Sequence, residues 1–189
     1  MKKITFLSIV FSILAVGTFM ASCSKSSSST PAPKPTLYDS LGGTAMVQDP
    51  TAASGTKIEA GRLLIRSIID STIFVIAGDS RINGHFTVLL TEVGMNNLTG
   101  FEELSKNLTD FVAVGTGAKD YTYGGLSMAN AHNPATNPRM NGKATNSDMD
   151  AFEADLVTGA GKNGVTTSNQ ALLSVAAIVE SLRSAVVQM

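Results

Sequence analysis

Cysteine is almost absent from this sequence of 189 residues, which contains Cys23 and no second thiol. A single cysteine excludes an intramolecular disulfide, because that bond needs two thiols. It also excludes a CxxC motif for redox or metal chemistry and a CxxCH motif for covalent haem attachment. Any chemistry of Cys23 therefore belongs to its own short segment near the amino terminus.

A strong excess of charge of either sign is also missing. The chain has 14 basic and 15 acidic side chains, and without Lys2 and Lys3 the count is 12 against 15, a formal charge of −3. The basic residues are scattered along the chain. No face is therefore predicted to attract the phosphates of nucleic acid, and we expect no nucleic-acid partner.

The amino-terminal segment has the pattern of a secretory signal. Lys2 and Lys3 precede an uncharged apolar run, residues 4–20, which leads through Ala21 and Ser22 to Cys23. A positive start, a short apolar stretch and small residues at a cleavage site are typical of a signal peptide. The run is slightly short for a membrane-spanning helix of about 20 residues.

The residues Met20-Ala-Ser-Cys23 resemble the lipobox of bacterial lipoproteins, with Met20 in place of the usual leucine. The resemblance implies cleavage before Cys23, so that residues 1–22 are the signal peptide, and lipidation of the Cys23 thiol. Several acyl chains anchor a protein stably, whereas one binds only marginally. We expect an exported protein, held by lipid to a bacterial membrane in the cell envelope or on its periplasmic face. The alternative is an ordinary signal peptide with a chance cysteine.

Residues 23–36 form a Ser/Pro-rich segment that is predicted to be a tether. It lacks the apolar side chains that a folded core needs. The remaining residues, 37–189, are enough for one domain with a core of its own.

The apolar spacing in residues 37–189 predicts helices, and clear strand alternation is found nowhere. Apolar residues three or four apart mark four helical stripes: residues 64–76, 101–112, 149–160 and 172–186. Pairs of capping residues are predicted to open three of these helices: Thr56 with Glu59, Thr99 with Glu102, and Thr167 with Gln170. The fold class is therefore predicted to be all-α.

Two polar segments separate these helices. Residues 133–148 are rich in Asn and Pro, and residues 48–56 form a second polar break. Both are predicted to be solvent-facing loops.

Five segments carry a family resemblance through their order and spacing. They are Leu37-Tyr-Asp-Ser-Leu-Gly-Gly43, Ile76-Ala-Gly-Asp-Ser-Arg-Ile-Asn-Gly-His-Phe86, residues 111–117, the pair Tyr121 and Tyr123, and Met128-Ala-Asn-Ala-His132. In this order they resemble the truncated haemoglobins, small bacterial globins of the group 1 type with a two-over-two helical sandwich. The resemblance extends from Leu37 to about Val187.

The resemblance implies a site for non-covalent haem b, with His132 as the proximal ligand of the iron. Phe86 matches a phenylalanine that packs on the porphyrin, while Met128 and Phe152 are expected to contact it as well. His85 is expected to be a partly exposed packing residue, with a second iron ligand as the alternative. The alternative for His132 is a residue that caps a short helix before Asn133.

On the distal side the sequence departs from the family. Ile73 stands where many members have a tyrosine, and it cannot donate a hydrogen bond. Glu103 and Asn107 match the two positions that face the gas ligand from the opposite helix, and Asn107 could donate to it. Because distal polarity determines what a haem does with oxygen, the loss of a tyrosine argues against tight binding and rapid nitric-oxide dioxygenation.

Lys106 matches a basic residue that pairs with a haem propionate, and Tyr123 is expected to assist there. Two insertions, residues 47–62 and 133–147, exceed the family pattern. The predicted function is binding of oxygen or another diatomic gas, with redox chemistry on oxygen or nitric oxide as a variant of it. Two alternatives are a haem-free globin-like module that is structural or binds a partner, and an extracytoplasmic haem carrier.

Overall fold

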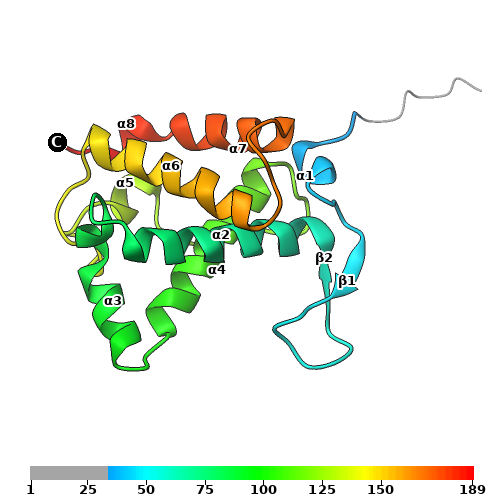
Figure 1. Cartoon of the computed structure of the whole chain (residues 1–189), viewed down its shortest axis with the longest axis horizontal. Helices are drawn as coiled ribbons and strands as arrows, with labels where there is room; N and C mark the ends of the chain where they lie inside the picture. The colour runs from blue at the N-terminus through cyan, green and yellow to red at the C-terminus, as the bar shows by residue number, and fades with distance from the viewer. Residues whose placement is uncertain (1–33) are drawn as a thin grey trace, which may run out of the picture. The chain divides into compact units, whose positions relative to one another are not determined.

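Helices make up most of the part of the chain that the structure describes, residues 34–189 of a computed structural model (Figure 1). The predicted signal peptide, Cys23 and most of the predicted tether lie outside the described residues. The helices are α1 (Leu37–Ser40), α2 (Ala60–Gly78), α3 (Thr87–Gly94), α4 (Thr99–Gly115), α5 (Met128–Ala131), α6 (Asn146–Lys162), α7 (Gln170–Glu180) and α8 (Arg183–Val186), with a 3₁₀ turn η1 (Asn83–Phe86). The all-α prediction is confirmed.

The four long helices form two layers. In Figure 1, α6 and α7 lie above α2 and α4, and α2 packs against both α6 and α4. The apolar side of α2 supplies the centre of the core through Ile65, Ile69 and Ile73, each at most 6% exposed. Leu156 of α6 meets this side and is 1% exposed. The apolar spacing read from the sequence therefore marks the buried sides of α2 and α6.

The crossing of α2 and α6 depends on a glycine. A methyl group at Gly159 would lie 2.8 Å from the backbone nitrogen of Thr72, which is closer than real side chains come. Thr72 is itself buried, and its hydroxyl donates to the Ile68 carbonyl. Because Gly159 has no side chain, the two backbones can approach at this point.

The prediction that strands are absent is wrong in one place. Strands β1 (Met46–Gln48) and β2 (Lys57–Glu59) form an antiparallel hairpin in which Val47 pairs with Ile58. Ile58 turns inward and is buried. Glu59 is therefore the last strand residue and the N-cap of α2, and it does not form the predicted capping box with Thr56.

The predicted caps of two other helices are also wrong, since α4 has Leu98 at its N-cap without a side-chain cap, whereas α7 is capped by an asparagine. Thr99 is the first residue of α4, and its backbone nitrogen donates to the side chain of Asn97. Asn169 caps α7 by accepting from the backbone nitrogen of Ala171. Thr145 caps α6 in a capping box that the sequence analysis did not predict.

The last predicted helix is two helices, α7 and α8, separated at Ser181 and Leu182. After α8 the chain turns back to the loop that precedes α6. Ala144 and Val187 form an isolated parallel bridge, and the backbone nitrogen of Gln188 donates to the Ala144 carbonyl at 3.1 Å. The Gln188 side chain donates to the carbonyl of Ala129 on α5 at 2.6 Å.

Within residues 34–189 no helix has both the length and the hydropathy needed to cross a bilayer. These residues form one compact unit. Thr36 already belongs to it, because its side chain and that of Asp39 form the capping box of α1.

Candidate functional site

A cavity of about 350 Å³ lies between the two helical layers. Its volume is within the range of pockets that hold small molecules and cofactors. Almost every described side chain that lines it is apolar, and the exceptions are His85, His132 and Asp148. A ligand held here would be bound mainly by apolar contact, with two imidazoles and one carboxylate as its polar neighbours.

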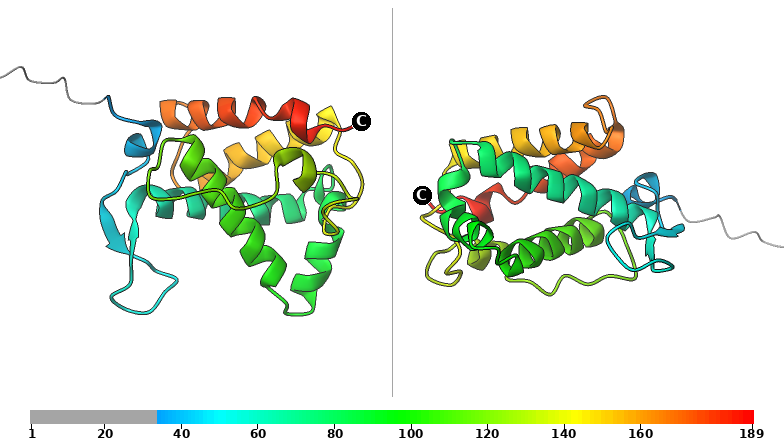
Figure 2. Two further views of the ribbon diagram at one scale, coloured as in Figure 1. Left: turned by 180° about the vertical axis from the view of Figure 1, so that it is seen from behind. Right: turned by 60° about the horizontal axis from the view of Figure 1, so that its bottom comes forward.

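Helix α4 supplies one wall of the cavity. The lining residues Phe101, Leu104, Leu108 and Phe111 recur three or four positions apart, so that they face the same way. Helices α3 and α4 form a V, with the turn at Met95 near its tip (Figure 2). This V forms one side of the cavity.

The opposite wall comes from α2, and the mouth of the cavity is apolar. Ile73 lines the cavity and is buried. Phe74 also lines it but is 68% exposed, and its ring lies 5.5 Å from that of Phe101. Leu98 at the start of α4 is likewise an exposed lining residue. The exposed residues of the cavity lining are therefore apolar.

His132 enters the cavity from the carboxyl end of α5. The helix begins after Ser127, whose hydroxyl accepts from the backbone nitrogen of Asn130. One turn later the Nδ1 of His132 lies 2.8 Å from the Met128 carbonyl oxygen. A carbonyl only accepts, so Nδ1 carries the proton and the lone pair is on Nε2.

The surroundings of His132 favour the neutral imidazole. Burial is the largest cause and lowers the pKa of His132 below its ordinary value of 6.5, and His85 lowers it further. The bond to Met128 acts in the opposite direction but does not cancel this effect. His132 does end a short helix, as the alternative reading required, yet the same bond leaves Nε2 available inside an apolar cavity.

His85 lines the same cavity, but both of its ring nitrogens have polar neighbours. Its Nδ1 lies 2.7 Å from the Asn141 carbonyl oxygen, and its Nε2 lies 3.1 Å from Oδ2 of Asp148. The side chain is 18% exposed, as expected for a partly exposed residue.

Several residues predicted for the site lie around the cavity. Phe86 follows His85 at the end of η1 and lines it, as do Met128 on α5 and Phe152 on α6. Ile73 lines it from α2. The structure thus brings these four residues together with His132.

Four other predicted residues are placed elsewhere. The ammonium group of Lys106 pairs with Asp110 at 2.7 Å, and Glu103 pairs with Arg139 at 2.7 Å. Tyr123 donates to the Leu126 carbonyl and packs edge-on against Phe111. Among the described residues that line the cavity, Lys106, Glu103, Asn107 and Tyr123 are all missing.

The second inserted segment is a largely solvent-exposed loop, as predicted, but it also supplies part of the cavity wall. Met140 and Ala144 line the cavity. Arg139 fixes the loop by pairing with Glu92 of α3 and with Glu103 of α4. Asp148 was not predicted for the site, although the spacing Thr145-Asn-Ser-Asp148 is itself a capping signal at the start of α6.

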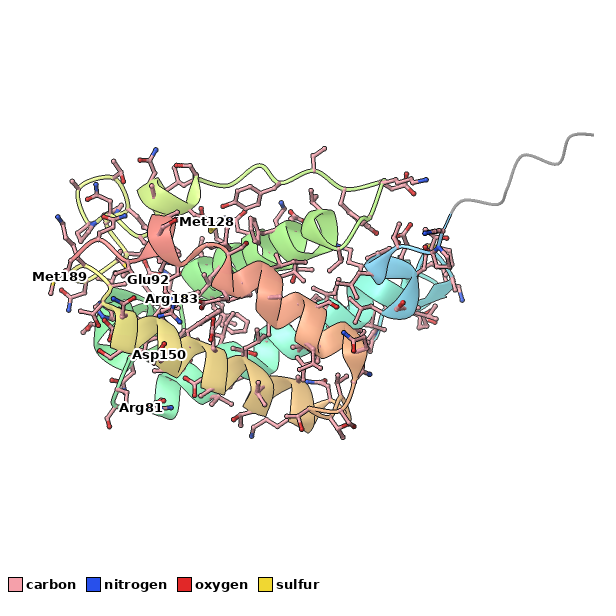
Figure 3. All side chains as sticks on the ribbon, turned by 90° about the horizontal axis from the view of Figure 1, so that it is seen from above. Arg81, Glu92, Met128, Asp150, Arg183 and Met189 are labelled. Atoms are coloured by element: carbon pink, nitrogen blue, oxygen red, sulfur yellow. The ribbon has the colours of Figure 1, made fainter. Side chains whose placement is uncertain are left out.

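Helices α5 and α8 are neighbours, so the segment that carries His132 is supported by the last helix (Figure 3). Arg183 of α8 in turn pairs with Asp150 of α6 at 2.8 Å. Leu182 and Val186 complete the cavity on this side.

A metal ion held by protein side chains alone has no evident place in the described chain. Nowhere in residues 34–189 do three or more His, Cys, Asp or Glu side chains come together in a way that could bind one.

No protein-family model matches the chain, and no curated protein matches it either. Among solved structures, it is similar to the truncated haemoglobin of Tetrahymena pyriformis, determined as a single-residue variant in its Fe(III) form. The identity is 19%, the TM-score is 0.56, and the match covers 82% of this chain and all of the other. The described chain therefore has the truncated-globin fold, and the predicted two-over-two sandwich is confirmed.

Proposed function

We propose that the domain binds non-covalent haem b in this cavity, with Nε2 of His132 as the axial ligand of the iron, and that its partner is a diatomic gas. The observation that carries the proposal is the bond from His132 Nδ1 to the Met128 carbonyl, beside an apolar cavity. Histidines that bind metals usually donate their other ring nitrogen in this way, which fixes the tautomer and the ring orientation. The solved haemoglobin of the same fold supports the proposal.

The haem group would supply the iron that binds the gas, and the protein would supply the surroundings. Phe86, Met128 and Phe152 offer apolar contact to the porphyrin. Ile73 and the lining residues of α4 offer no hydrogen-bond donor. Distal polarity controls oxygen chemistry, so these surroundings favour reversible binding with rapid release over tight binding or dioxygenation.

A haem-free module is the second candidate, and one observation favours it. Haem carries two propionates, yet the expected partner Lys106 is already paired with Asp110. Among the described lining residues, none is a lysine or arginine. On this reading the cavity would hold an uncharged apolar ligand, and the domain would bind a partner without iron chemistry.

We also propose that the chain is exported and anchored by lipid on Cys23. The support is the sequence alone: Lys2 and Lys3, the apolar run and the lipobox-like residues that end at Cys23. Anchored in this way, the domain would meet its gas outside the cytoplasm. A redox partner would be needed only for chemistry beyond reversible binding.

The sharpest test is to replace His132 with glycine. Wild-type protein supplied with haem should show the Soret band and the ferrous spectrum of a histidine-ligated haem. His132→Gly should lose that ferrous spectrum, and added imidazole should restore much of it by filling the space left by the side chain. His85→Gly is the matched control, because its nitrogens are engaged elsewhere.

Two results would contradict the proposal. Loss of the spectrum in His85→Gly with its retention in His132→Gly would exchange the roles of the two histidines. A wild-type domain without any Soret band would favour the haem-free module.

A further inference from the structure

The cavity wall formed by η1 and α3, residues 83–94, differs from the other walls in how it is held. Phe86, Leu89, Leu90 and Val93 of this segment line the cavity. None of residues 83–94 belongs to the main apolar core, to which α2, α4, α6 and α7 all contribute buried residues. Leu89 is the one buried residue of α3, and η1 has none. The segment therefore gains little burial from the core, and a bound ligand would add to it.

The two ends of this segment meet positions that are fixed. Ile82, just before it, is 6% exposed and packs in the smaller apolar cluster. After α3 comes an exposed turn in which Asn96 has a left-handed backbone with a φ of 58°, and the turn leads to the buried Gly100. Neither η1 nor α3 has a side-chain cap at its start. Residues 83–94 thus join two anchored positions and are themselves weakly anchored.

The inserted loop holds the segment through polar contacts. The Arg139 guanidinium pairs with Glu92 of α3 at 3.2 Å. The side chain of Asn141 donates to the Gly84 carbonyl at 2.9 Å, and its backbone nitrogen donates to the His85 carbonyl at 2.9 Å. Arg139 is 35% exposed, and the bond to Gly84 is exposed as well. Exposed contacts of this kind hold weakly and break readily.

The loop is anchored independently of residues 83–94. The side chains of Thr136 and Asn137 donate to carbonyl oxygens at α5, both at 2.7 Å. At the other end of the loop, the Ala144 carbonyl accepts from the backbone nitrogen of Gln188 at 3.1 Å. Loss of the contacts between the loop and residues 83–94 would therefore free that segment and leave the loop in place.

The Arg139–Glu92 pair has a fitted seat on α4. A methyl group at Gly100 would lie 2.9 Å from Nε of Arg139, and it would also collide with the carboxylate of Glu92. Because Gly100 has no side chain, the pair can lie against the first turn of α4. Arg139 also pairs with Glu103 of α4 at 2.7 Å. The guanidinium thus joins α3 to the loop and to α4 at one point.

We propose that residues 83–94 are a lid through which the ligand of the cavity enters and leaves, and that the Arg139–Glu92 pair is its latch. When the latch opens, the lid swings about its two ends and uncovers the cavity. A bound ligand stabilises the closed lid, because it covers the apolar inner side of the segment. With haem as the ligand the inference rests on the proposed function, but the lid itself can be tested without haem.

Hydrogen exchange of the ligand-free protein tests the lid and its latch. The parent protein lacks residues 1–22 and carries Cys23→Ala, and its residues 34–189 form one compact unit. Residues 83–94 should exchange faster than α2 and α6. Glu92→Gln removes the charge and keeps the shape, so it should speed the exchange of the lid by about two- to fivefold, the range for an exposed ion pair.

Glu103→Gln is the matched control. It makes the same change beside the same arginine, but Glu103 lies on α4 and not on the lid. It should leave the exchange of residues 83–94 at the parent rate.

The release of haem tests the route. Haem-loaded protein is mixed with excess apomyoglobin, which traps haem as it leaves. Glu92→Gln should release haem about two- to fivefold faster than the parent, because release follows the fraction of open lid, and Glu103→Gln should release it at the parent rate. Bound haem should also slow the exchange of residues 83–94.

Three results would overturn the inference. They are exchange of the lid as slow as that of α2, equal exchange of the lid in the two glutamine variants, and haem release at the parent rate in a Glu92→Gln protein whose lid exchanges faster. A parent protein without a Soret band would instead overturn the proposed function. Hydrogen exchange would then still decide the lid and its latch, and release of the uncharged apolar dye Nile red from the same three proteins would decide the route.

Discussion

Replacing Ile73 with tyrosine should slow the release of oxygen, because it adds a donor to a wall of the cavity that offers none. Ile73 is 6% exposed and lines the cavity from α2. A hydrogen bond between neutral groups contributes about 0.5–1.5 kcal/mol net. Since 1.4 kcal/mol corresponds to about a factor of ten, Ile73→Tyr should reduce the oxygen off-rate by about two- to twelvefold.

Ile73→Phe is the control that separates the hydroxyl from the ring. Both aromatic side chains are larger than isoleucine, and overpacking a core commonly costs about 1–3 kcal/mol of stability. That cost is shared by the two variants, so the comparison of their off-rates isolates the donor. Stopped-flow displacement of oxygen by excess carbon monoxide measures these rates.

Equal off-rates for Ile73→Tyr and Ile73→Phe would refute the reasoning, since the phenol would then not reach the gas. Asn107→Leu supplies a second check. The sequence suggested Asn107 as the donor, but the structure places it outside the described lining of the cavity. Its removal should leave the off-rate unchanged.

Three further predictions concern stability, pH and export. The buried Tyr38 hydroxyl donates to Glu59 at 2.5 Å, and a hydrogen bond to a charged group contributes about 1.5–3 kcal/mol. Tyr38→Phe should therefore lower the Tm by about 3–12 °C in thermal unfolding. Tyr123→Phe removes an exposed hydrogen bond to the Leu126 carbonyl and should change the Tm little, so equal losses would contradict this. Burial lowers the pKa of His132, so on acidification the unfolded chain protonates this imidazole before the folded chain does. The free energy of unfolding, measured by urea titration, should therefore fall as the pH drops from about 7 through the unfolded-state pKa towards the folded-state pKa. His132→Gln should remove this pH dependence, and an unchanged pH profile in the variant would argue against it. Cys23→Ala should abolish incorporation of labelled fatty acid, and label that still enters the variant would refute the lipid anchor.

The helical faces could be read from the sequence because they depend on spacing alone. Ile65, Ile69 and Ile73 of α2 fall on one side of any helix, and that side is the buried one. The residues at which the helices begin could be predicted less well. Glu59 fits a capping box by spacing, but pairing of β2 with β1 keeps it extended.

His132 and Phe86 could be found because each lies in a short local pattern that the resemblance fixes. The contact between His85 and Asp148 joins η1 to α6 across the inserted loop, and no local pattern encodes it. The polar composition of the loop indicated its exposed residues, but not that Met140 and Ala144 line the cavity. Its asparagines bond its own backbone, as Asn133 does with Ala135, and this leaves Met140 free to turn inward.

The contacts after α8 have a consequence for the order in which the molecule is made. Leu182 and Val186 are among the last residues of the sequence, yet they wall the cavity, and Gln188 ties down both α5 and the inserted loop. A chain synthesised from its amino terminus at about 5–20 residues per second cannot enclose a ligand until this segment has emerged. If the polypeptide crosses a membrane before it folds, as a signal peptide implies, the cavity is completed on the far side. The cofactor would then have to reach that compartment by a route of its own.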